Sequence, residues 1–294
     1  MDLENICDVP LRPLERRLLD AFQRDLPLVA PPYQVMADAT GSREGDVLEA
    51  LGRLRETGVL SRVGLVIRPN TAGASTLAAM AVPDADLAAV AARVSARPEV
   101  NHNYEREHRL NLWFVVAAAD AQALQQTLRE IERETGYAVL DLPLEAAYHI
   151  DLGFSLASNE AVIRNKFKSP DPKAGLKVSV TDQDRHILAA LQDGLSLVPR
   201  PFTQPAAQLG ITEAELLSEL RWLMVCGVIK RCGLIVRHHE LGYRANAMVV
   251  WNVPDHLVDE VGARLATLPF VTLCYRRPRR LPDWPYNLFC MIHG

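Results

Sequence analysis

Two stretches of this 294-residue chain gather histidine, tyrosine, arginine and tryptophan at a spacing that suits a binding or catalytic site. The first spans residues 101–114 and reads NHNYEREHRLNLWF. Alternate residues of a β-strand share one face, which predicts four functional side chains on a single strand face: His102, Tyr104, Arg106 and His108. The next predicted strand carries Asn111 and Trp113 at alternate positions, so the hairpin can present all six to one ligand.

The second stretch, residues 274–293, is richer in arginine. Four of the five residues 276–280 are arginine, and the sequence DWPYNLFCMIH closes the stretch. Its candidate ligand-binding side chains are Tyr275, Arg276, Arg277, Trp284, Tyr286 and Asn287. His293 falls on the same strand face as Asn287, which makes it a candidate for chemistry in this stretch.

These residue types indicate a flat ligand that carries several carboxylates. Arginine binds a carboxylate through paired hydrogen bonds, aromatic faces suit a planar ring, and histidine titrates near neutral pH. His102 and His108 are therefore candidate general acids, assisted by Tyr104, with His293 as the candidate of the second stretch. More positive charge is expected beside two further predicted strands, from Arg62, Arg68, Arg231 and Arg237.

A simpler interpretation exists for each of these side chains. Arginines beside a strand are usually solvated, a histidine in a strand is usually a satisfied polar side chain, and the tryptophans could belong to the core. The clustering favours the functional interpretation, because no fold requires histidine, tyrosine, arginine and histidine on one strand face. By itself, the pattern specifies a class of ligand and no reaction.

An internal repeat decides the architecture. Residues 58–68 (GVLSRVGLVIR) match residues 227–237 (GVIKRCGLIVR) at an offset of 169. The Val-Pro-Asp sequence at 82–84 recurs at 253–255. Two copies of one module are therefore fused in one chain.

Each copy opens with the spacing of a winged helix-turn-helix. Thr181 and Asp184 form a capping-box-like start for one of the first helices. Apolar periodicity predicts first helices at 12–25 and 181–193, short segments at 33–39 and 202–208, second helices at 42–56 and 212–225, and wing strands at 63–67 and 232–236.

The rest of copy one alternates in the pattern of a ferredoxin-like fold. The predicted order is strand 76–82, helix 84–96, strands 99–106 and 110–117, helix 120–134 and strand 145–152. The expected fold class is therefore α+β, a tandem repeat of a winged helix-turn-helix plus a ferredoxin-like (βαββαβ) domain. Such a chain is a covalent pseudo-dimer.

The expected domains are winged helix-turn-helices at 12–70 and 181–238, ferredoxin-like domains at 71–155 and 239–294, and a linker at 156–180. The linker loses periodicity and gathers proline, lysine and serine. The second ferredoxin-like domain is expected to be incomplete, because no helix and final strand follow its last predicted strand. Either the sequence continues beyond residue 294, or copy two borrows these elements.

Charge disfavours DNA as a partner. The chain has 32 lysines and arginines against 36 acidic residues, a net charge of −4. The second helices, which would read DNA, are acidic: residues 42–56 sum to −1 and residues 212–225 to −2. Because DNA affinity depends largely on neutralising phosphates, packing of the domain is the favoured role for these helices.

Composition indicates a cytoplasmic protein that does not enter a membrane. No apolar run approaches the roughly 20 residues that span a bilayer, and the sequence begins with acidic residues rather than a signal peptide. The five cysteines are scattered and include no Cys-x-x-Cys, which favours reduced thiols over a zinc or iron–sulfur site. We therefore expect no metal site in the protein itself.

Residues 102–114 (HNYEREHRLNLWF) and 284–294 (WPYNLFCMIHG) resemble the signatures of the siroheme decarboxylases, which are Lrp/AsnC-like proteins that act on a tetrapyrrole. The fused arrangement resembles the form found in heme d1 biosynthesis. The resemblance implies removal of carbon dioxide from the C12 and C18 acetate side chains of siroheme, giving 12,18-didecarboxysiroheme. Siroheme is flat, carries iron and has eight carboxylates, as the pocket deduced from the residues requires.

The resemblance also bears on cofactors and partners. Because the macrocycle can accept the electrons left by decarboxylation, no cofactor is expected beyond the iron of siroheme itself. Contacts with other heme d1 biosynthesis proteins and further homo-oligomerisation stay open. Two alternative functions also stay open: an Lrp/AsnC-type ligand-responsive DNA-binding regulator and a non-catalytic siroheme carrier.

The two copies differ at the candidate site. Leu273 stands where copy one has His102, and Arg277 with a longer hairpin follows where Glu107 and His108 would lie. Ala117 is the copy-one counterpart of His293. The sequence leaves open which half removes which carboxylate, which histidine is the acid, and whether a histidine ligates the iron of siroheme.

Overall fold

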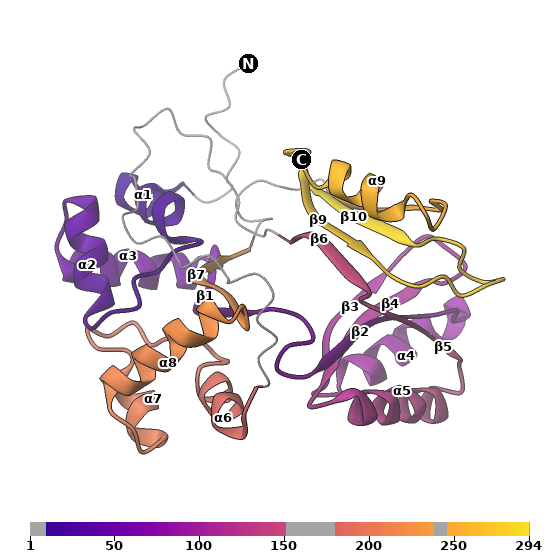
Figure 1. The fold of residues 1–294 in the computed structure, drawn as a ribbon, viewed down its shortest axis with the longest axis horizontal. Coiled ribbons are helices and arrows are strands. Elements are labelled where there is room, and N and C mark those ends of the chain that lie inside the picture. Colours follow the sequence, from indigo (N-terminus) through magenta and orange to yellow (C-terminus); the bar gives the residue numbers. More distant parts are fainter. Residues whose placement is uncertain (1–9, 151–179, 238–245, 294) are drawn as a thin grey trace. The chain divides into compact units, whose positions relative to one another are not determined.

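The computed structural model describes residues 10–150, 180–237 and 246–293 (Figure 1). The chain forms two units, and each unit contains one part of each copy. Unit 1 combines Met1–Arg68 with Gly153–Arg244, and unit 2 combines Pro69–Leu152 with Ala245–Gly294. The predicted helix-turn-helices therefore share unit 1 and the ferredoxin-like parts share unit 2. Nearly all of the predicted linker lies outside the described residues.

Unit 1 contains the helix-turn-helix of both copies. Its helices are α1 (Pro13–Phe22), α2 (Pro32–Thr40) and α3 (Glu44–Glu56) from copy one, and α6 (Asp182–Ala190), α7 (Thr203–Gln208) and α8 (Glu213–Val225) from copy two. The predicted capping box of Thr181 and Asp184 is present, since each side chain bonds the backbone N–H of the other residue. Gly41 ends α2 with a positive φ of 65°, a conformation that glycine adopts without strain.

The predicted wing strands pair with each other rather than within their own copies. Strands β1 (Leu60–Ile67) and β7 (Ile229–Val236) run antiparallel in a two-stranded sheet, with Gly64 opposite Gly233. The repeat aligns these two glycines with one another, so the pairing is self-complementary. Because each copy supplies one strand here, the backbone hydrogen bonds of each strand require the other copy.

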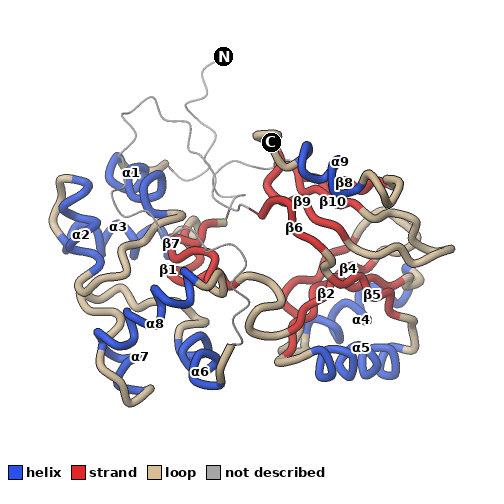
Figure 2. Tube along the Cα trace, in the orientation of Figure 1, coloured by secondary structure: helices blue, strands red, loops and turns tan. Residues whose placement is uncertain are grey.

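Copy one builds the first sheet of unit 2, in the order β3-β4-β2-β5. Its strands are β2 (Ala74–Met80), β3 (Val100–Glu105), β4 (Leu112–Ala118) and β5 (Val139–Pro143). Helices α4 (Asp84–Ser95) and α5 (Ala121–Thr135) cover one face (Figure 2), and Met80, Phe114 and Val116 are buried there with apolar side chains of both helices. The predicted ferredoxin-like pattern is confirmed, except at its last strand.

The last predicted strand is present, but it does not belong to the first sheet. We predicted one strand at 145–152, but the chain forms two short strands, β5 and then β6 (Ala146–Ile150). Strand β5 closes the first sheet beside β2, whereas β6 pairs antiparallel with β9 of copy two. Residues 139–150 (VLDLPLEAAYHI) are mostly apolar or small, and Pro143 marks the end of β5, but neither feature indicates that the next strand joins another sheet.

Copy two builds the second sheet, in the order β6-β9-β10-β8. It supplies β8 (Asn246–Trp251), β9 (Val271–Arg276) and β10 (Leu288–His293), with α9 (Val258–Leu265) on one face. Copy two thus receives one strand from copy one, next to β9. The final strand that it was expected to borrow would lie next to β8, the counterpart of β2, so that expectation stays a prediction. Within the described part of the chain, copy two has no counterpart of α5 or β5.

The two sheets pack against each other through an apolar cluster from both copies. Copy one contributes Ala79, Leu110 and Leu142, and copy two contributes Tyr275, Trp284 and Phe289. The hairpin between β9 and β10 and the loop between β3 and β4 meet at this cluster, which brings the two predicted functional stretches together.

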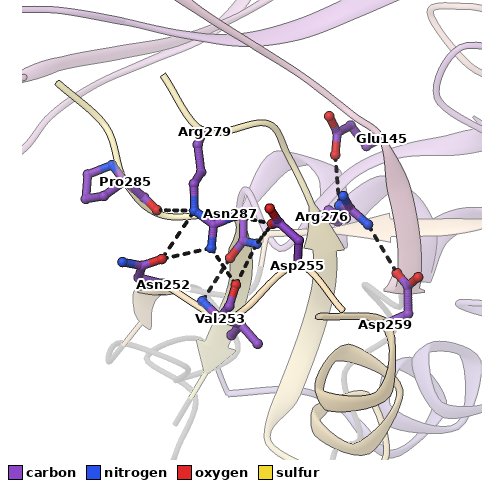
Figure 3. A network of polar contacts seen from close by, with 9 residues as sticks. All are labelled: Glu145, Asn252, Val253, Asp255, Asp259, Arg276, Arg279, Pro285 and Asn287. Atoms are coloured by element: carbon purple, nitrogen blue, oxygen red, sulfur yellow. Dashed lines mark hydrogen bonds and ion pairs between the residues drawn. The ribbon is translucent and has the colours of Figure 1, made fainter. Parts of the chain in front are cut away.

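Polar contacts fix β6 on the second sheet. The Tyr148 hydroxyl donates to Asp259, and Nε of Arg276 lies 2.9 Å from Oε2 of Glu145 (Figure 3). The Tyr148 ring packs directly on Gly262, where a Cβ atom would collide with it. Burial, with the hydrogen bond to Asp259, raises the pKa of Tyr148, so the hydroxyl remains a donor at neutral pH.

Replacing Gly262 with alanine is expected to loosen β6. The added methyl group forces the Tyr148 ring or the strand to move, which costs about 1–3 kcal/mol. The midpoint of thermal unfolding should fall, and the amides of residues 146–150 should exchange hydrogen for deuterium faster than in the parent protein.

Gly52→Ala is the matched control, because a Cβ at Gly52 of α3 meets no atom within 4 Å. Alanine should be neutral there or stabilise the helix by up to about 1 kcal/mol. If Gly262→Ala left both the midpoint and the exchange of β6 unchanged, the packing of Tyr148 would not be what holds this strand.

Candidate functional site

An aromatic cluster joins the two copies in unit 2. The buried Trp284 of copy two packs edge-on against Trp113 and His108 of copy one, with ring centroids 4.9 Å and 5.7 Å apart. Tyr286 lies 4.9 Å from Trp284 on the copy-two side. Such edge-to-face pairs are favoured by the charge distribution of aromatic rings. Four of the predicted site residues therefore form one aromatic cluster: His108, Trp113, Trp284 and Tyr286.

His108 is an exposed member of this cluster, and its ring accepts a hydrogen bond from the backbone. Its Nδ1 accepts from the backbone N–H of Leu110 at 3.0 Å. In the neutral imidazole this assigns the ring proton to Nε2. His108 can therefore donate from Nε2, while protonation of Nδ1 requires the bond to Leu110 to break.

Arg277 is a mostly buried cation that forms no ion pair with a carboxylate of the described residues, although the charge of Asp141 partly opposes the effect of burial on its pKa. Its guanidinium lies over the Tyr275 ring at 4.7 Å and near the Phe289 ring at 6.0 Å, and Nη1 donates to the backbone oxygen of Leu142. The buried Nε has no hydrogen-bond partner. Burial lowers the pKa of Arg277 and raises that of Tyr275. A cation in this setting favours an anionic ligand, because a buried charge is costly unless it is paired.

The neighbouring arginines already have partners. Arg276 pairs with Glu145 and lies 3.7 Å from Asp259, whereas Arg279 contacts Asp255, Asn252 and the backbone of Val253 and Pro285 (Figure 3). The hydrogen bond from Arg279 lowers the pKa of Asp255. These contacts hold the hairpin in place, so the predicted ligand-binding role of Arg276 competes with two carboxylates of the protein itself.

Copy one repeats the Tyr-x-Arg arrangement in an open form. The repeat aligns Tyr104 and Arg106 with Tyr275 and Arg277, and Arg106 lies over its tyrosine ring at 5.1 Å. Tyr104 is 50% exposed, whereas Tyr275 is 7% exposed. Arg106 is also exposed and donates to the backbone oxygen of Glu105 at 3.0 Å. The same pair thus exists in two environments.

The positions of the other two candidate acids follow from strand register. His102 lies in β3 opposite Val115, and His293 lies in β10 opposite Asn246. Tyr104 is opposite Trp113, so His102 and Tyr104 occupy the β3 positions of the face that carries Trp113. The side chains of His102 and His293 are outside the described residues, and their catalytic roles stay predictions.

Asn111 and Asn287 use their amides to hold the backbone. Asn111 donates to the oxygen of Val82 at 2.8 Å and accepts from its N–H at 3.0 Å. Asn287 makes the same pair of bonds with Val253, at 2.9 Å and 3.0 Å. Each asparagine therefore ties a hairpin to the strand end beside it, and the predicted ligand contact of both stays a prediction.

The wing arginines belong to unit 1. Arg231 is buried and donates to the backbone oxygen of Gln23, so it joins copy two to copy one within that unit. Arg62 is half-buried, and the end of the Arg237 guanidinium lies near Gly58. The predicted ligand-binding role of Arg62, Arg68, Arg231 and Arg237 stays a prediction; for Arg231 it would be additional to this internal contact.

Several arginines of the helix-turn-helices also serve the protein itself. In α3, Nε of Arg53 lies 2.9 Å from the buried carboxylate of Glu15, and Arg43 pairs with Asp46. In α8, Arg221 donates to the backbone oxygen of Leu28 in copy one. These contacts favour packing over phosphate binding, in agreement with the acidic charge of both helices.

The carboxylates that pair with the hairpin arginines were not identified from the sequence. Glu145, Asp255 and Asp259 lie far from the arginines along the chain, and single acidic residues have no distinctive local pattern. The repeat offered one signal, because Asp255 belongs to the recurring Val-Pro-Asp sequence.

Three further features of the described residues bear on what the protein can do. No group of three or more histidine, cysteine, aspartate or glutamate side chains among them is arranged to hold a metal ion. Cys226, Cys232, Cys274 and Cys290 are free thiols. None of the helices in these residues is both long and apolar enough to cross a membrane.

Family models match both halves of the architecture. The AsnC-like ligand binding domain matches residues 72–149 and 240–294, and the siroheme decarboxylase NirDL-like HTH domain matches residues 15–60 and 184–229. Each family model therefore matches the chain twice, once in each copy of the repeat. The fold defines a protein of the class that joins a helix-turn-helix to an AsnC-like ligand-binding domain.

Similar proteins define the family. The chain is 48% identical to a siroheme decarboxylase NirDL subunit of Paracoccus denitrificans, over 96% of this chain and 85% of the relative. It is 54% identical to a siroheme decarboxylase NirD subunit of Pseudomonas aeruginosa, over 50% of this chain and 97% of that subunit. A crystal structure of the siroheme decarboxylase NirDL with an iron-uroporphyrin III analogue matches with a TM-score of 0.71 and 30% identity, covering 96% of this chain and 82% of that one. The chain belongs to the siroheme decarboxylase family.

Substituting Asn111 or Asn287 with alanine is expected to destabilise unit 2. Each change leaves a backbone N–H without its side-chain acceptor, which costs on the order of 1–3 kcal/mol. Denaturant unfolding should show this loss for both variants. Siroheme bound per folded molecule should stay close to the parent value, whereas a large loss of affinity without a loss of stability would restore the predicted ligand contact.

Proposed function

We propose that this chain removes carbon dioxide from the C12 and C18 acetate side chains of siroheme, giving 12,18-didecarboxysiroheme for heme d1 biosynthesis. Membership of the siroheme decarboxylase family supports the reaction and the substrate class. The observation in this chain that carries the proposal is Arg277, a mostly buried cation without a carboxylate partner in the described part of the chain, held on the ring of Tyr275. A substrate with eight carboxylates supplies the missing anion.

The reaction requires one proton for each carboxylate lost. Breaking the bond between the methylene and the carboxylate releases carbon dioxide and leaves an electron pair on the methylene carbon. The conjugated macrocycle delocalises this pair, and a proton delivered to the carbon converts the acetate side chain to a methyl group. Because the substrate itself stabilises the charge, the proposal requires no cofactor beyond the iron of siroheme.

The residues of unit 2 divide between binding and proton transfer. Arg277 and Arg106 bind spectator carboxylates, and Trp113, Trp284 and Tyr286 provide apolar surface for the ring. Binding energy from these remote contacts orients the reacting acetate. His108 donates from Nε2, the nitrogen that its bond to Leu110 leaves available.

His102, Tyr104 and His293 complete the proposed set of proton donors. We assign His102 and Tyr104 to the same reaction centre as His108. Both lie in β3, which leads directly into the loop that carries His108. His293 stands in β10 of copy two, at a position where copy one has alanine. Unequal halves are consistent with two decarboxylations that follow one another. The free thiols support a reducing, cytoplasmic location.

Arg277→Met is expected to weaken siroheme binding while the protein stays folded. Loss of a charge-assisted carboxylate contact corresponds to a roughly tenfold or larger rise in Kd. Methionine fills similar space without a buried charge, so the free energy of unfolding should be unchanged or higher. Siroheme titration and denaturant unfolding measure the two effects.

Arg276→Met is the matched control on the same hairpin. It removes the pairs with Glu145 and Asp259, so stability should fall by about 1 kcal/mol while the affinity for siroheme stays within twofold. If Arg276→Met lost affinity and Arg277→Met kept it, the assignment of the carboxylate-binding arginine would be wrong.

His108→Ala is expected to slow decarboxylation by about 100-fold or more, because a positioned proton donor contributes on that scale. Purified protein is incubated with siroheme without oxygen, and product masses are followed by chromatography. His102→Ala and His293→Ala test the other candidates, and accumulation of the mono-decarboxylated species assigns a histidine to the second step.

His256→Ala is the control for this series, since His256 is exposed in the turn that precedes α9 and belongs to none of the aromatic pairs around Trp284. Unchanged rates for all three candidate variants would exclude histidine as the acid. Siroheme that is bound by the parent protein but never converted would instead favour a carrier.

A further inference from the structure

The loop between β3 and β4 and the hairpin between β9 and β10 share an ion pair beside the aromatic cluster. Nη2 of Arg109 donates to Oδ1 of Asp283 at 2.6 Å. Arg109 directly follows His108 in the chain, and Asp283 directly precedes Trp284. The ion pair therefore joins the two copies at the positions next to the ring contact of His108 with Trp284.

The copy-two end of this ion pair stands on a closed turn. Two backbone hydrogen bonds of 2.8 Å and 2.7 Å join Arg280 to Trp284, and Asp283 lies between them in the chain. Nε of Arg280 also donates to the backbone oxygen of Asp141 in β5 at 2.9 Å, which ties the turn to copy one. Asp283 is the only acidic residue among residues 276–287, which include four arginines. Arg109 thus pairs with the single carboxylate of a cationic hairpin.

The copy-one end of the ion pair belongs to the loop that carries the proposed proton donor. The loop is closed on itself, since the N–H of Arg106 bonds the oxygen of Asn111 at 2.8 Å and the N–H of His108 bonds the oxygen of Arg106 at 2.9 Å. Leu110 is buried in the apolar cluster with Trp284, whereas His108 is exposed. Arg109 lies between this buried residue and the imidazole, so its ion pair acts on the part of the loop that bears His108.

The repeat shows that the ion pair has no counterpart on the other copy. Counted back from the aligned Asn111 and Asn287, Arg109 falls at the position of Pro285, and Asp283 falls at that of Glu107. Proline carries no charge, so the equivalent pair of Glu107 with residue 285 cannot form. A contact that occurs only beside His108 favours a role for this histidine over a general role in packing the two copies.

We propose that Arg109 and Asp283 are positioning residues that hold the His108 imidazole in the orientation needed for proton transfer. The copy-two hairpin then sets the geometry of the copy-one acid. This inference rests on the proposed function of His108. A proton donor must stand within hydrogen-bond reach of the atom that it protonates, and a displacement of about 1 Å can slow an enzyme roughly 100-fold.

The exposure of the ion pair separates positioning from stability. The side chains of Arg109 and Asp283 are 60% and 53% exposed. Exposed ion pairs contribute little to the stability of a fold, because water screens the charges and two long side chains lose freedom. Loss of the pair should therefore change the rate of the reaction while the protein stays folded.

Asp283→Asn is the first test, since it removes the charge and keeps the size of the side chain. In the assay with siroheme and without oxygen, kcat should fall about tenfold, while the Kd for siroheme stays within about twofold. The backbone N–H of Leu110, which bonds Nδ1 of His108, should exchange with deuterium faster than in the parent protein. The midpoint of thermal unfolding should not change.

A charge swap keeps the test independent of any single variant. Arg109→Asp and Asp283→Arg should each lose activity, and the double variant should recover kcat to within about threefold of the parent. Glu134→Gln is the matched control, because Glu134 forms an ion pair of the same 2.6 Å length with Arg97 elsewhere in unit 2. The control should change neither kcat nor the exchange of Leu110.

Comparison with His108→Ala separates this inference from the proposed function. In that background Asp283→Asn should change the residual rate by less than about twofold, because both substitutions act through one imidazole. A slow His108→Ala together with Asp283→Asn at the parent rate overturns the positioning role alone. A full rate in His108→Ala overturns the acid assignment, and the positioning role with it. Tighter siroheme binding by Asp283→Asn would show that Arg109 binds substrate instead, and would also overturn the proposal.

Discussion

Backbone pairing between the two copies is the constraint on which the rest of the molecule depends. Strand β1 finds its partner in β7, and β6 finds its partner in β9. Because buried N–H and C=O groups must be satisfied, neither helix-turn-helix nor ferredoxin-like part is complete by itself. In unit 2 this exchange brings the copy-two hairpin against the copy-one loop, which places His108 beside Trp284 and Arg277 on the backbone of Leu142.

Among the described residues, only the second sheet of unit 2 contains a strand from the other copy. Residues that the repeat aligns therefore lie in different environments. Tyr275 and Arg277 are enclosed because β5 and β6 of copy one pack beside them, whereas Tyr104 and Arg106 lie on an open edge. A cation interacts more strongly with an anion where water is excluded. Under the proposed function, the same Tyr-x-Arg sequence is therefore expected to bind a carboxylate more strongly in copy two than in copy one, although the residue types are identical.

The sequence was sufficient for the architecture, but not for the contacts that the candidate site residues make. Apolar periodicity and the repeat predicted both helix-turn-helices and the order of the first ferredoxin-like sheet, because these depend on local spacing. The destination of β6 was missed, since a strand that changes sheet has the same alternation as one that does not. The backbone contacts of Asn111 and Asn287 were not predicted either, because an asparagine that binds backbone and one that binds a ligand look the same in a sequence.

The arginines of the hairpin between β9 and β10 differ in whether carboxylates of the protein neutralise them. Glu145, Asp255 and Asp259 neutralise Arg276 and Arg279, and in doing so they fix the hairpin in one conformation. Arg277 on the same hairpin then faces the aromatic rings with its charge unpaired by any carboxylate of the described residues. A cation held ready in this way loses little conformational freedom when a ligand binds. If Arg277 binds the substrate as proposed, selectivity for a ring with many carboxylates depends less on the number of arginines than on which of them the protein leaves for the ligand.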